Sequence, residues 1–309
     1  MAVYPLSPTM PDLSGKYIPE LWHPTLLEKF YNLSTVWDIS NTDYDGEIKD
    51  QGDTVHINQY PAVPTHAHSK GQKITYDMLE TPDTIDLLID KGRGYGFMVD
   101  RIDELQSKIE VQSKWAEAAG IQLKVDIDAD VLTTMPSQAS AYNVGNSAGK
   151  ESGGFKLGVT GNPIGLTSQN ILGYFADLQS VLNECNIPDD GNRWIVLPEW
   201  AANKLNKSDL IDASLTGDAK SVIRNGLMGE IYGFKVYKSN QVPKVTDTVP
   251  CYYIMAGHKK AHTFATQLTE YETFKHPDYY GTAVRGLMVY GTKVVQETAL
   301  AVLYAKNAA

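Results

Sequence analysis

The chain has 309 residues, of which 42% are hydrophobic, 21% charged and 10% aromatic. This composition is typical of an ordered globular protein and excludes a disordered chain, and the length predicts about two domains. The formal net charge of −10 argues against the broad basic surface that a sequence-specific nucleic-acid reader needs.

Residues 1–22 are predicted to form an extended arm. Four prolines and Gly15 stand there among small polar residues, and this composition prevents regular structure. Apolar side chains of the arm, such as Tyr17, need a surface to cover them, and a neighbouring subunit would provide one. A short helix with one apolar side is expected over residues 24–33, where Pro24 occupies a first-turn position.

A projecting hairpin is predicted between residues 44 and 99. Two short β-like runs, 54–57 and 84–89, flank a long polar stretch that is rich in proline, serine and glycine. So long a connection between strands is uncommon in a compact domain and is usually functional. We therefore expect the stretch to project from the body of the protein.

The clearest element is a long helix over residues 100–135. Apolar residues recur there every three or four positions, and Pro136 would end the helix. At about 1.5 Å per residue such a helix is on the order of 50 Å long and would span the molecule. Gly120, near its middle, predicts a bend or a close packing partner.

Residues 137–165 contain seven glycines and are expected to form a loop or a linker between domains. The chain after them alternates helix and strand, which predicts a compact α/β domain. Its expected helices are one capped by Thr167 or Ser168 that runs to Leu182, and one over 198–205. Its expected strands cover residues 194–197, 231–237 and 252–255.

The last section, residues 286–304, consists of apolar segments that are typical of strands. A lone strand would leave backbone groups unpaired, so we expect this section to return to an earlier domain.

Three glycine- or aspartate-rich motifs imitate binding sites. Asp126, Asp128 and Asp130 have the spacing of calcium-loop ligands, but Val131 occupies the obligatory glycine position, so a solvated helix face is predicted. The segment 145–151 lacks the spacing of a phosphate loop. The alternating glycines of residues 92–96 lack the dinucleotide-binding fingerprint, and we expect them near a hairpin base and the entry into the long helix.

Histidine placement leaves one catalytic alternative open. His66 and His68 would lie on the same side of an extended segment, a geometry that metals accept, so a metal-dependent hydrolase is kept as an alternative of a different class. No third ligand lies near them in sequence, and His258, His262 and His276 are near no nucleophile motif. We therefore assign no catalytic, cofactor-binding or metal-binding residue and expect the protein not to be an enzyme.

The two cysteines, Cys185 and Cys251, belong to no metal-ligand spacing and are expected to be free thiols. No apolar run approaches the ~18 residues that span a bilayer, and the first residues lack the pattern of a secretion signal. We expect a soluble protein made in a reducing cytoplasm, with no membrane contact.

An arm, a hairpin, a spanning helix, an α/β domain and returning strands, in this order, resemble the Hong Kong 97-type fold of tailed-bacteriophage major capsid proteins. The sequence also resembles that family in a series of strings, namely residues 17–22, 41–48, 51–55, 87–91, 233–237, 239–240, 256–259, 286–291 and 299–304. The resemblance implies an α+β fold made of an N-arm, an E-loop hairpin, a P-domain with a long spine helix, and an α/β A-domain. The implied boundaries are 1–47 for the N-arm, 48–96 for the E-loop, 97–167 for the P-domain, 168–281 for the A-domain, and 282–309 for a return strand to the P-domain.

The same resemblance implies a major capsid protein that self-assembles through hexamers and pentamers into an icosahedral shell. The shell would enclose a dsDNA genome without sequence-specific binding, in a virion assembled in the host bacterial cytoplasm. Implied partners are a separate scaffolding protein, a portal and decoration proteins. An encapsulin-like compartment shell is the alternative with the same fold.

The resemblance also implies that the A-domain meets its copies at the capsomer centre and that the E-loop reaches over an adjacent subunit. Candidate subunit-contact residues follow from this arrangement and lie in the arm and in the hairpin: Tyr17, Trp22, His66, His68, Lys70 and Lys73.

Overall fold

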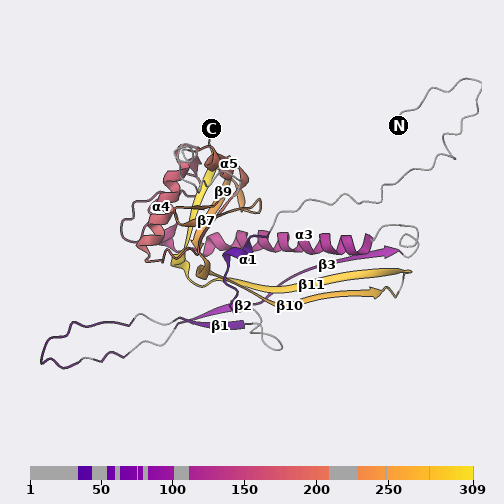
Figure 1. Cartoon of the computed structure of the whole chain (residues 1–309), viewed down its shortest axis with the longest axis horizontal. Helices are drawn as coiled ribbons and strands as arrows, with labels where there is room; N and C mark the ends of the chain where they lie inside the picture. Colours follow the sequence, from indigo (N-terminus) through magenta and orange to yellow (C-terminus); the bar gives the residue numbers. More distant parts are fainter. Residues whose placement is uncertain are drawn as a thin grey trace, which may run out of the picture.

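The computed structural model describes residues 34–43, 54–59, 63–74, 76–78, 83–100, 111–208, 229–247, 249–277 and 279–308. Its strands form three sheets, and a long helix, α3 (Val111–Thr134), joins a compact lobe to an elongated arm (Figure 1). The helix expected over 24–33 and the contact candidates Tyr17 and Trp22 lie outside the described residues. No described helix has the length and apolar character needed to cross a membrane.

The lobe is built on a seven-stranded mixed sheet. Along the sheet the strands are β4 (Ile164–Leu166), β12 (Leu300–Asn307), β9 (Val249–His258), β5 (Arg193–Leu197), β7 (Phe234–Lys238) and β6 (Glu230–Ile231), and β8 (Lys244–Asp247) pairs with β9. Two helices belong to the same lobe, α4 (Ile171–Glu184) and α5 (Glu199–Asn206). β5 is a central strand, and all five of its residues are buried.

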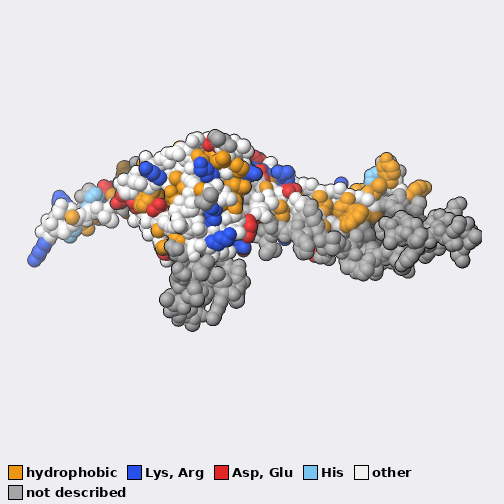
Figure 2. All heavy atoms as spheres, turned by 90° about the horizontal axis from the view of Figure 1, so that it is seen from above, with side chains coloured by type: hydrophobic (Ala, Val, Ile, Leu, Met, Phe, Trp, Pro, Cys, Tyr) orange, Lys and Arg blue, Asp and Glu red, His pale blue; other side chains and the backbone are white. Residues whose placement is uncertain are grey.

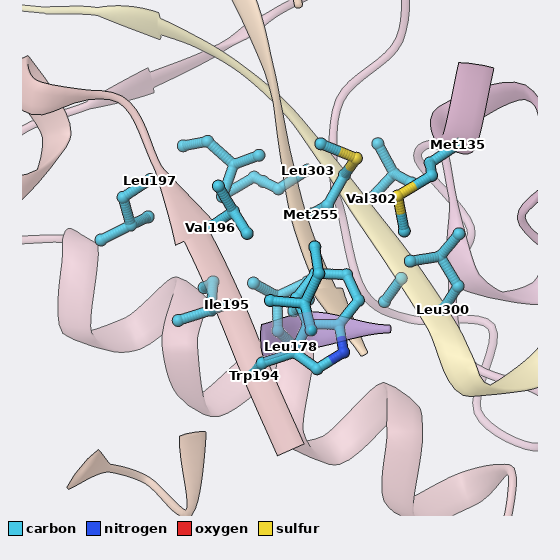
Figure 3. Close-up of a cluster of buried hydrophobic side chains, with 14 of the residues drawn as sticks. Met135, Leu178, Trp194, Ile195, Val196, Leu197, Met255, Leu300, Val302 and Leu303 are labelled. Atoms are coloured by element: carbon cyan, nitrogen blue, oxygen red, sulfur yellow. The ribbon is translucent and has the colours of Figure 1, made fainter. Parts of the chain in front are cut away.

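The core of the lobe is continuous with the end of the long helix. Leu178 of α4 packs among side chains of β5, β9 and β12, and Met135, directly after α3, belongs to the same cluster (Figure 3). Each such apolar side chain contributes about 1.5–3 kcal/mol when it is fully buried. This cluster therefore fixes α3 to the lobe.

The elongated arm consists of α3 and a three-stranded antiparallel sheet. The strand order is β10 (His262–Lys275), β11 (Gly281–Val294) and β3 (Lys91–Asp100), with β11 in the centre. A separate two-stranded sheet, β1 (Thr54–Gln59) and β2 (Asp83–Leu88), carries a long projecting connection that points away from the arm (Figure 1).

The remaining described elements are short. The helix α1 (Val36–Ile39) lies between α3 and the start of β10. Four single-turn 3₁₀ helices connect the larger elements: η1 (Met135–Gln138), η2 (Ala141–Asn143), η3 (Lys259–Ala261) and η4 (Glu297–Ala299).

Most predicted elements of the sequence are confirmed, with corrections at their ends. The predicted start of the long helix at Asp100 is wrong, because Asp100 ends β3 and pairs with Gly281 of β11. The predicted strand 231–237 is two strands joined by a tight turn, in which Tyr232 and Gly233 both have positive φ angles of 50° and 74°. α4 begins at Ile171, after Asn170, and not at the expected caps Thr167 or Ser168.

Three other segments also differ from expectation. The glycines of residues 92–96 follow the hairpin base, as expected, but they lie inside β3 and not at the entry into a helix. The stretch 137–165 packs onto the lobe, with Ala148 and Leu157 fully buried, so it is an ordered part of the lobe and not a free linker. Residues 282–309, expected to be one return strand, contain β11 beside β3 and β12 beside β9 and β4.

Candidate assembly surfaces

The projecting connection between β1 and β2 has the properties of a contact surface. In β1 and β2 every residue from Thr54 to Gln59 pairs with one from Leu88 back to Asp83, so the base of the projection is a regular hairpin. Beyond it, residues 63–74 and 76–78 have no regular secondary structure, and all those with a described side chain are exposed. Nothing in the described chain covers the large apolar side chains of this segment, which are Val63, Ile74, Tyr76 and Met78, exposed by 67%, 67%, 87% and 99%.

Four of the predicted contact residues lie together near the tip of this hairpin. His66, His68, Lys70 and Lys73 are all exposed, as expected for a loop tip. His66 Nε2 contacts the carboxylate of Asp77 on the returning chain, which ties the two sides of the loop. Within the described ranges no three potential ligands are grouped closely enough to hold a metal ion.

The hairpin base is attached to the arm by a second, smaller core. Val55, Ile57, Leu87 and Ile89 pack with Ala265 of β10, and Val289 of β11 borders them. The base of the hairpin is therefore attached to the arm by apolar contacts, while its tip extends beyond the body.

A second surface lies at the far end of the arm. Tyr271, Tyr279 and Tyr280 are exposed by 60%, 63% and 88%, around the turn between β10 and β11. Figure 2 shows hydrophobic side chains gathered toward this end of the molecule, and lysine and histidine side chains at the opposite end, where the hairpin tip lies. Apolar area exposed at both ends is typical of a protein that covers it by association.

Residues 34–43, called here the N-terminal segment, are held to the body by two buried residues, Asp128 and His262. The Asp128 carboxylate of α3 accepts hydrogen bonds from Thr35 N at 2.6 Å and from Ser34 Oγ at 2.7 Å. Burial raises the pKa of Asp128, and these hydrogen bonds offset part of that rise. Near the other end of residues 34–43, Asn41 N donates a hydrogen bond to the His262 carbonyl oxygen at 2.8 Å.

His262 is fully buried between two hydroxyl groups. Its Nδ1 lies 2.7 Å from Ser40 Oγ and its Nε2 lies 2.5 Å from Thr292 Oγ1. Burial lowers the pKa of His262 to about 3, so the ring is neutral at physiological pH. The ring therefore acts as an uncharged bridge between the N-terminal segment and β11.

Asp130 connects the long helix to the sheet of the arm. Its Oδ2 accepts hydrogen bonds from Lys91 Nζ at 2.7 Å and from Tyr290 Oη at 2.9 Å. Partial burial acts to raise the pKa of Asp130, but the hydrogen bonds from Lys91 and Tyr290 outweigh it, and the net pKa is lowered. Burial, followed by the contact with Asp130, raises the pKa of Tyr290 to about 12.

The prediction of a solvated face for the three aspartates is thus wrong for Asp128 and incomplete for Asp130. Only Asp126 is exposed, where its Oδ1 accepts a hydrogen bond from Gln122. The burial of Asp128 could have been predicted from its spacing. Asp128 lies three and four residues before the buried Val131 and Leu132, and residues at this spacing share one side of a helix.

Comparisons with known proteins agree with one another. A family model described as phage capsid protein matches residues 82–303. A solved structure from Mycobacterium phage Che8 is 26% identical, with a TM-score of 0.73, over 94% of this chain and 97% of that one. The capsid of cyanophage P-SCSP1u is 16% identical, with a TM-score of 0.74 over 94% of both chains, and that of cyanophage Pam1 is 11% identical, with a TM-score of 0.68 over 100% of both. A comparison with curated protein sequences gave no match.

Proposed function

Because the chain belongs to the phage capsid protein family, we propose that its hairpin and its N-terminal arm complete the shell by lying on neighbouring copies. The protein is a major capsid protein that forms the phage shell, and it has the Hong Kong 97-type fold. It is a structural protein of the virion, and it works as an oligomer.

The observation that carries the proposal is the uncovered hairpin. Residues 63–74 and 76–78 extend away from the body, and Tyr76 and Met78 are exposed by 87% and 99%. A stable interface buries about 1,200–2,000 Å² in total, and an extended segment supplies contact area that a compact lobe lacks. Modest contacts repeated under closed symmetry make the whole assembly far more stable than any one contact.

The finer assignments rest on the family resemblance and on the charge of the chain. The copies form hexamers and pentamers of an icosahedral shell around dsDNA, and the net charge of −10 suits a container that does not bind its cargo tightly. The shell catalyses no reaction and assembles in the host cytoplasm, with a separate scaffolding protein, a portal and decoration proteins. The proposed domain boundaries are 1–47 for the N-arm, 48–96 for the E-loop, 97–167 for the P-domain, 168–281 for the A-domain and 282–309 for the return strand.

Deletion of the hairpin connection tests the proposal. Residues 61–79 are removed and the paired ends of β1 and β2 are joined by a short glycine turn, while an unchanged chain serves as the control. The deletion leaves the lobe core intact, so we expect a folded subunit with an unchanged circular dichroism spectrum. Electron microscopy should show closed particles for the control and none for the deletion; normal particles from the deletion variant would refute the proposed role.

A compartment shell of the encapsulin type would have the same fold. The cargo separates the two functions, because a phage shell encloses nucleic acid and a compartment shell encloses a protein. We expect nuclease-resistant DNA in native particles, detected by absorbance at 260 nm after capsid disruption. Particles that hold only protein would support the compartment.

A further inference from the structure

A small apolar cleft lies on the lobe, close to the end of α3. One wall is the seven-stranded sheet, with Tyr253 of β9 and Tyr304 of β12, whose ring centroids are 4.8 Å apart. Val302 of β12, which also lines the cleft, lies next to Met135 in the core of the lobe (Figure 3). The other wall is the glycine-rich stretch 144–160. Every residue that lines the cleft is uncharged.

Backbone contacts hold the glycine-rich wall of the cleft in place. Tyr304 N donates to the Leu157 carbonyl oxygen at 2.8 Å, and Leu157 N donates to the Gly145 carbonyl oxygen at 2.7 Å. Gly158 has a φ angle of 81°, and a Cβ there would lie 2.4 Å from the Tyr304 carbonyl oxygen, so glycine lets the stretch lie directly on β12. The cleft is therefore formed before anything binds in it, as ligand sites usually are.

The first residues of the chain carry a pattern that matches such a cleft. Pro5, Pro8 and Pro11 recur every three residues. A polyproline II helix has three residues per turn, so prolines at this spacing lie on one of its faces. Segments of this kind bind in aromatic-lined grooves, because they are extended before they bind and lose little entropy. An arm that only had to be extended would not need its prolines at this spacing.

We propose that residues 4–11 occupy this cleft of their own lobe in the unassembled subunit and leave it when the arm moves onto a neighbouring copy. This inference rests on the proposed function and adds how the arm is held before assembly.

The length of the arm permits this contact. Ser34 Oγ donates a hydrogen bond to Asp128, which lies eight residues before Pro136 at the cleft. At about 1.5 Å per residue, roughly 12 Å along the helix axis separates the two positions. Residues 12–33 connect Ser34 to the proline segment, and a flexible chain of this length has a mean end-to-end distance of about 25 Å. Such a tether gives the segment a local concentration on the order of a millimolar at its own cleft.

The chemistry of the segment also fits the cleft. Residues 4–11 contain no charged side chain, whereas residues 12–33 contain three acidic and two basic ones. The uncharged cleft therefore favours the proline segment over the rest of the arm. A polyproline II helix makes no internal hydrogen bonds, so its carbonyl oxygens need donors. The hydroxyl groups of Tyr253 and Thr160, one from each wall of the cleft, can supply them.

Disulfide cross-linking in the unassembled subunit tests the contact. A chain with Thr9→Cys and Val159→Cys is oxidised with diamide below the concentration at which particles form, and the link between residues 9 and 159 is measured by mass spectrometry after digestion. Val159 lies at the cleft and is exposed by 39%. The control chain carries Thr9→Cys and Lys124→Cys, because Lys124 is exposed and lies only four residues from Asp128, outside the cleft.

The expected result is a link within one chain, at a yield at least tenfold above that of the control. Equal yields would overturn the inference, because they would show only random contact of a tethered arm. A link that joins two chains instead of closing within one would also overturn it, since the occupant would then come from a second copy.

Assembly kinetics give a second test. Replacement of Pro5, Pro8 and Pro11 by alanine removes the repeat, and Val159→Glu places a charge at the cleft. Each change should free the arm and shorten the lag before particles form, followed by light scattering, at least twofold. The two changes together should have no further effect, because they break the same contact. Pro19→Ala, outside the three-residue repeat, is the control and should keep the wild-type lag.

An unchanged lag in either variant, or effects that add in the combined variant, would overturn the inference. A wild-type chain that forms no particles would instead refute the proposed function, and the cross-link within the unassembled subunit would still decide whether the cleft holds the proline segment.

Discussion

Replacement of His262 tests how the N-terminal segment is held to the body. In the folded protein burial lowers the pKa of His262 to about 3, whereas the pKa of an unperturbed histidine is about 6.5. Between these two values the unfolded chain binds a proton that the folded chain excludes, so stability falls as the pH falls. A pH of 5 is about 1.5 units below the pKa of histidine in the unfolded chain, and each unit corresponds to about 1.4 kcal/mol. The free energy of unfolding at pH 5 should therefore be about 2 kcal/mol lower than at pH 8.

Urea unfolding of the unassembled subunit at pH 8 and pH 5, followed by tryptophan fluorescence, measures this loss. His262→Asn keeps a polar atom near Ser40 Oγ but does not titrate, so its stability should fall by about 2 kcal/mol less than that of the wild type between the two pH values. Gly173→Ala, which changes no titratable group, is the control and should keep the wild-type dependence. Identical pH dependences for the wild type and His262→Asn would refute the reasoning.

Two further substitutions test other parts of the fold by urea unfolding. Asp128→Ala leaves the amide of Thr35 without its acceptor and should lower the free energy of unfolding by about 2–3 kcal/mol. Asp128→Asn should lower it less, because it keeps an acceptor and removes a charge that burial disfavours. Equal losses for the two variants would contradict this account. Gly158→Ala should cost more than about 2 kcal/mol, because φ is 81° and the new Cβ would lie 2.4 Å from the Tyr304 carbonyl oxygen. Gly173→Ala should instead stabilise α4 by up to about 1 kcal/mol, because a Cβ there meets nothing within 4 Å. Effects of the same sign from the two substitutions would be inconsistent with this packing.

The sequence predicted the elements whose hydrophobic pattern is strong. The far end of α3 and the buried strand β5 lie where apolar periodicity and a following proline place them. β3 was missed as a strand because alternate glycines give no hydrophobic signal, although its partner β11 supplies the backbone hydrogen bonds that stabilise it. The turn at Tyr232 was missed because a tyrosine with a positive φ angle has no sequence signature.

Some features of the candidate surfaces could be predicted from the sequence and others could not. A long polar connection between two short strands predicted the projecting hairpin, and the exposure of His66 and Lys70 confirms a loop tip. The spacing of Asp128 to Val131 and Leu132 indicates its buried side of the helix, but the hydrogen-bond partners of Asp128 and His262 could not be predicted, since they lie 93 and 222 residues away in the chain. Which residues contact a neighbouring copy stays a prediction, because such contacts depend on the arrangement of copies as well as on the single chain.

A cryo-electron microscopy map of particles assembled from the expressed chain tests the central claim most directly. We expect closed shells in which the hairpin residues 63–74 and 76–78 of each copy lie on an adjacent copy. A map in which these residues fold back onto their own lobe, or a chain that stays monomeric with its scaffold present, would contradict the account.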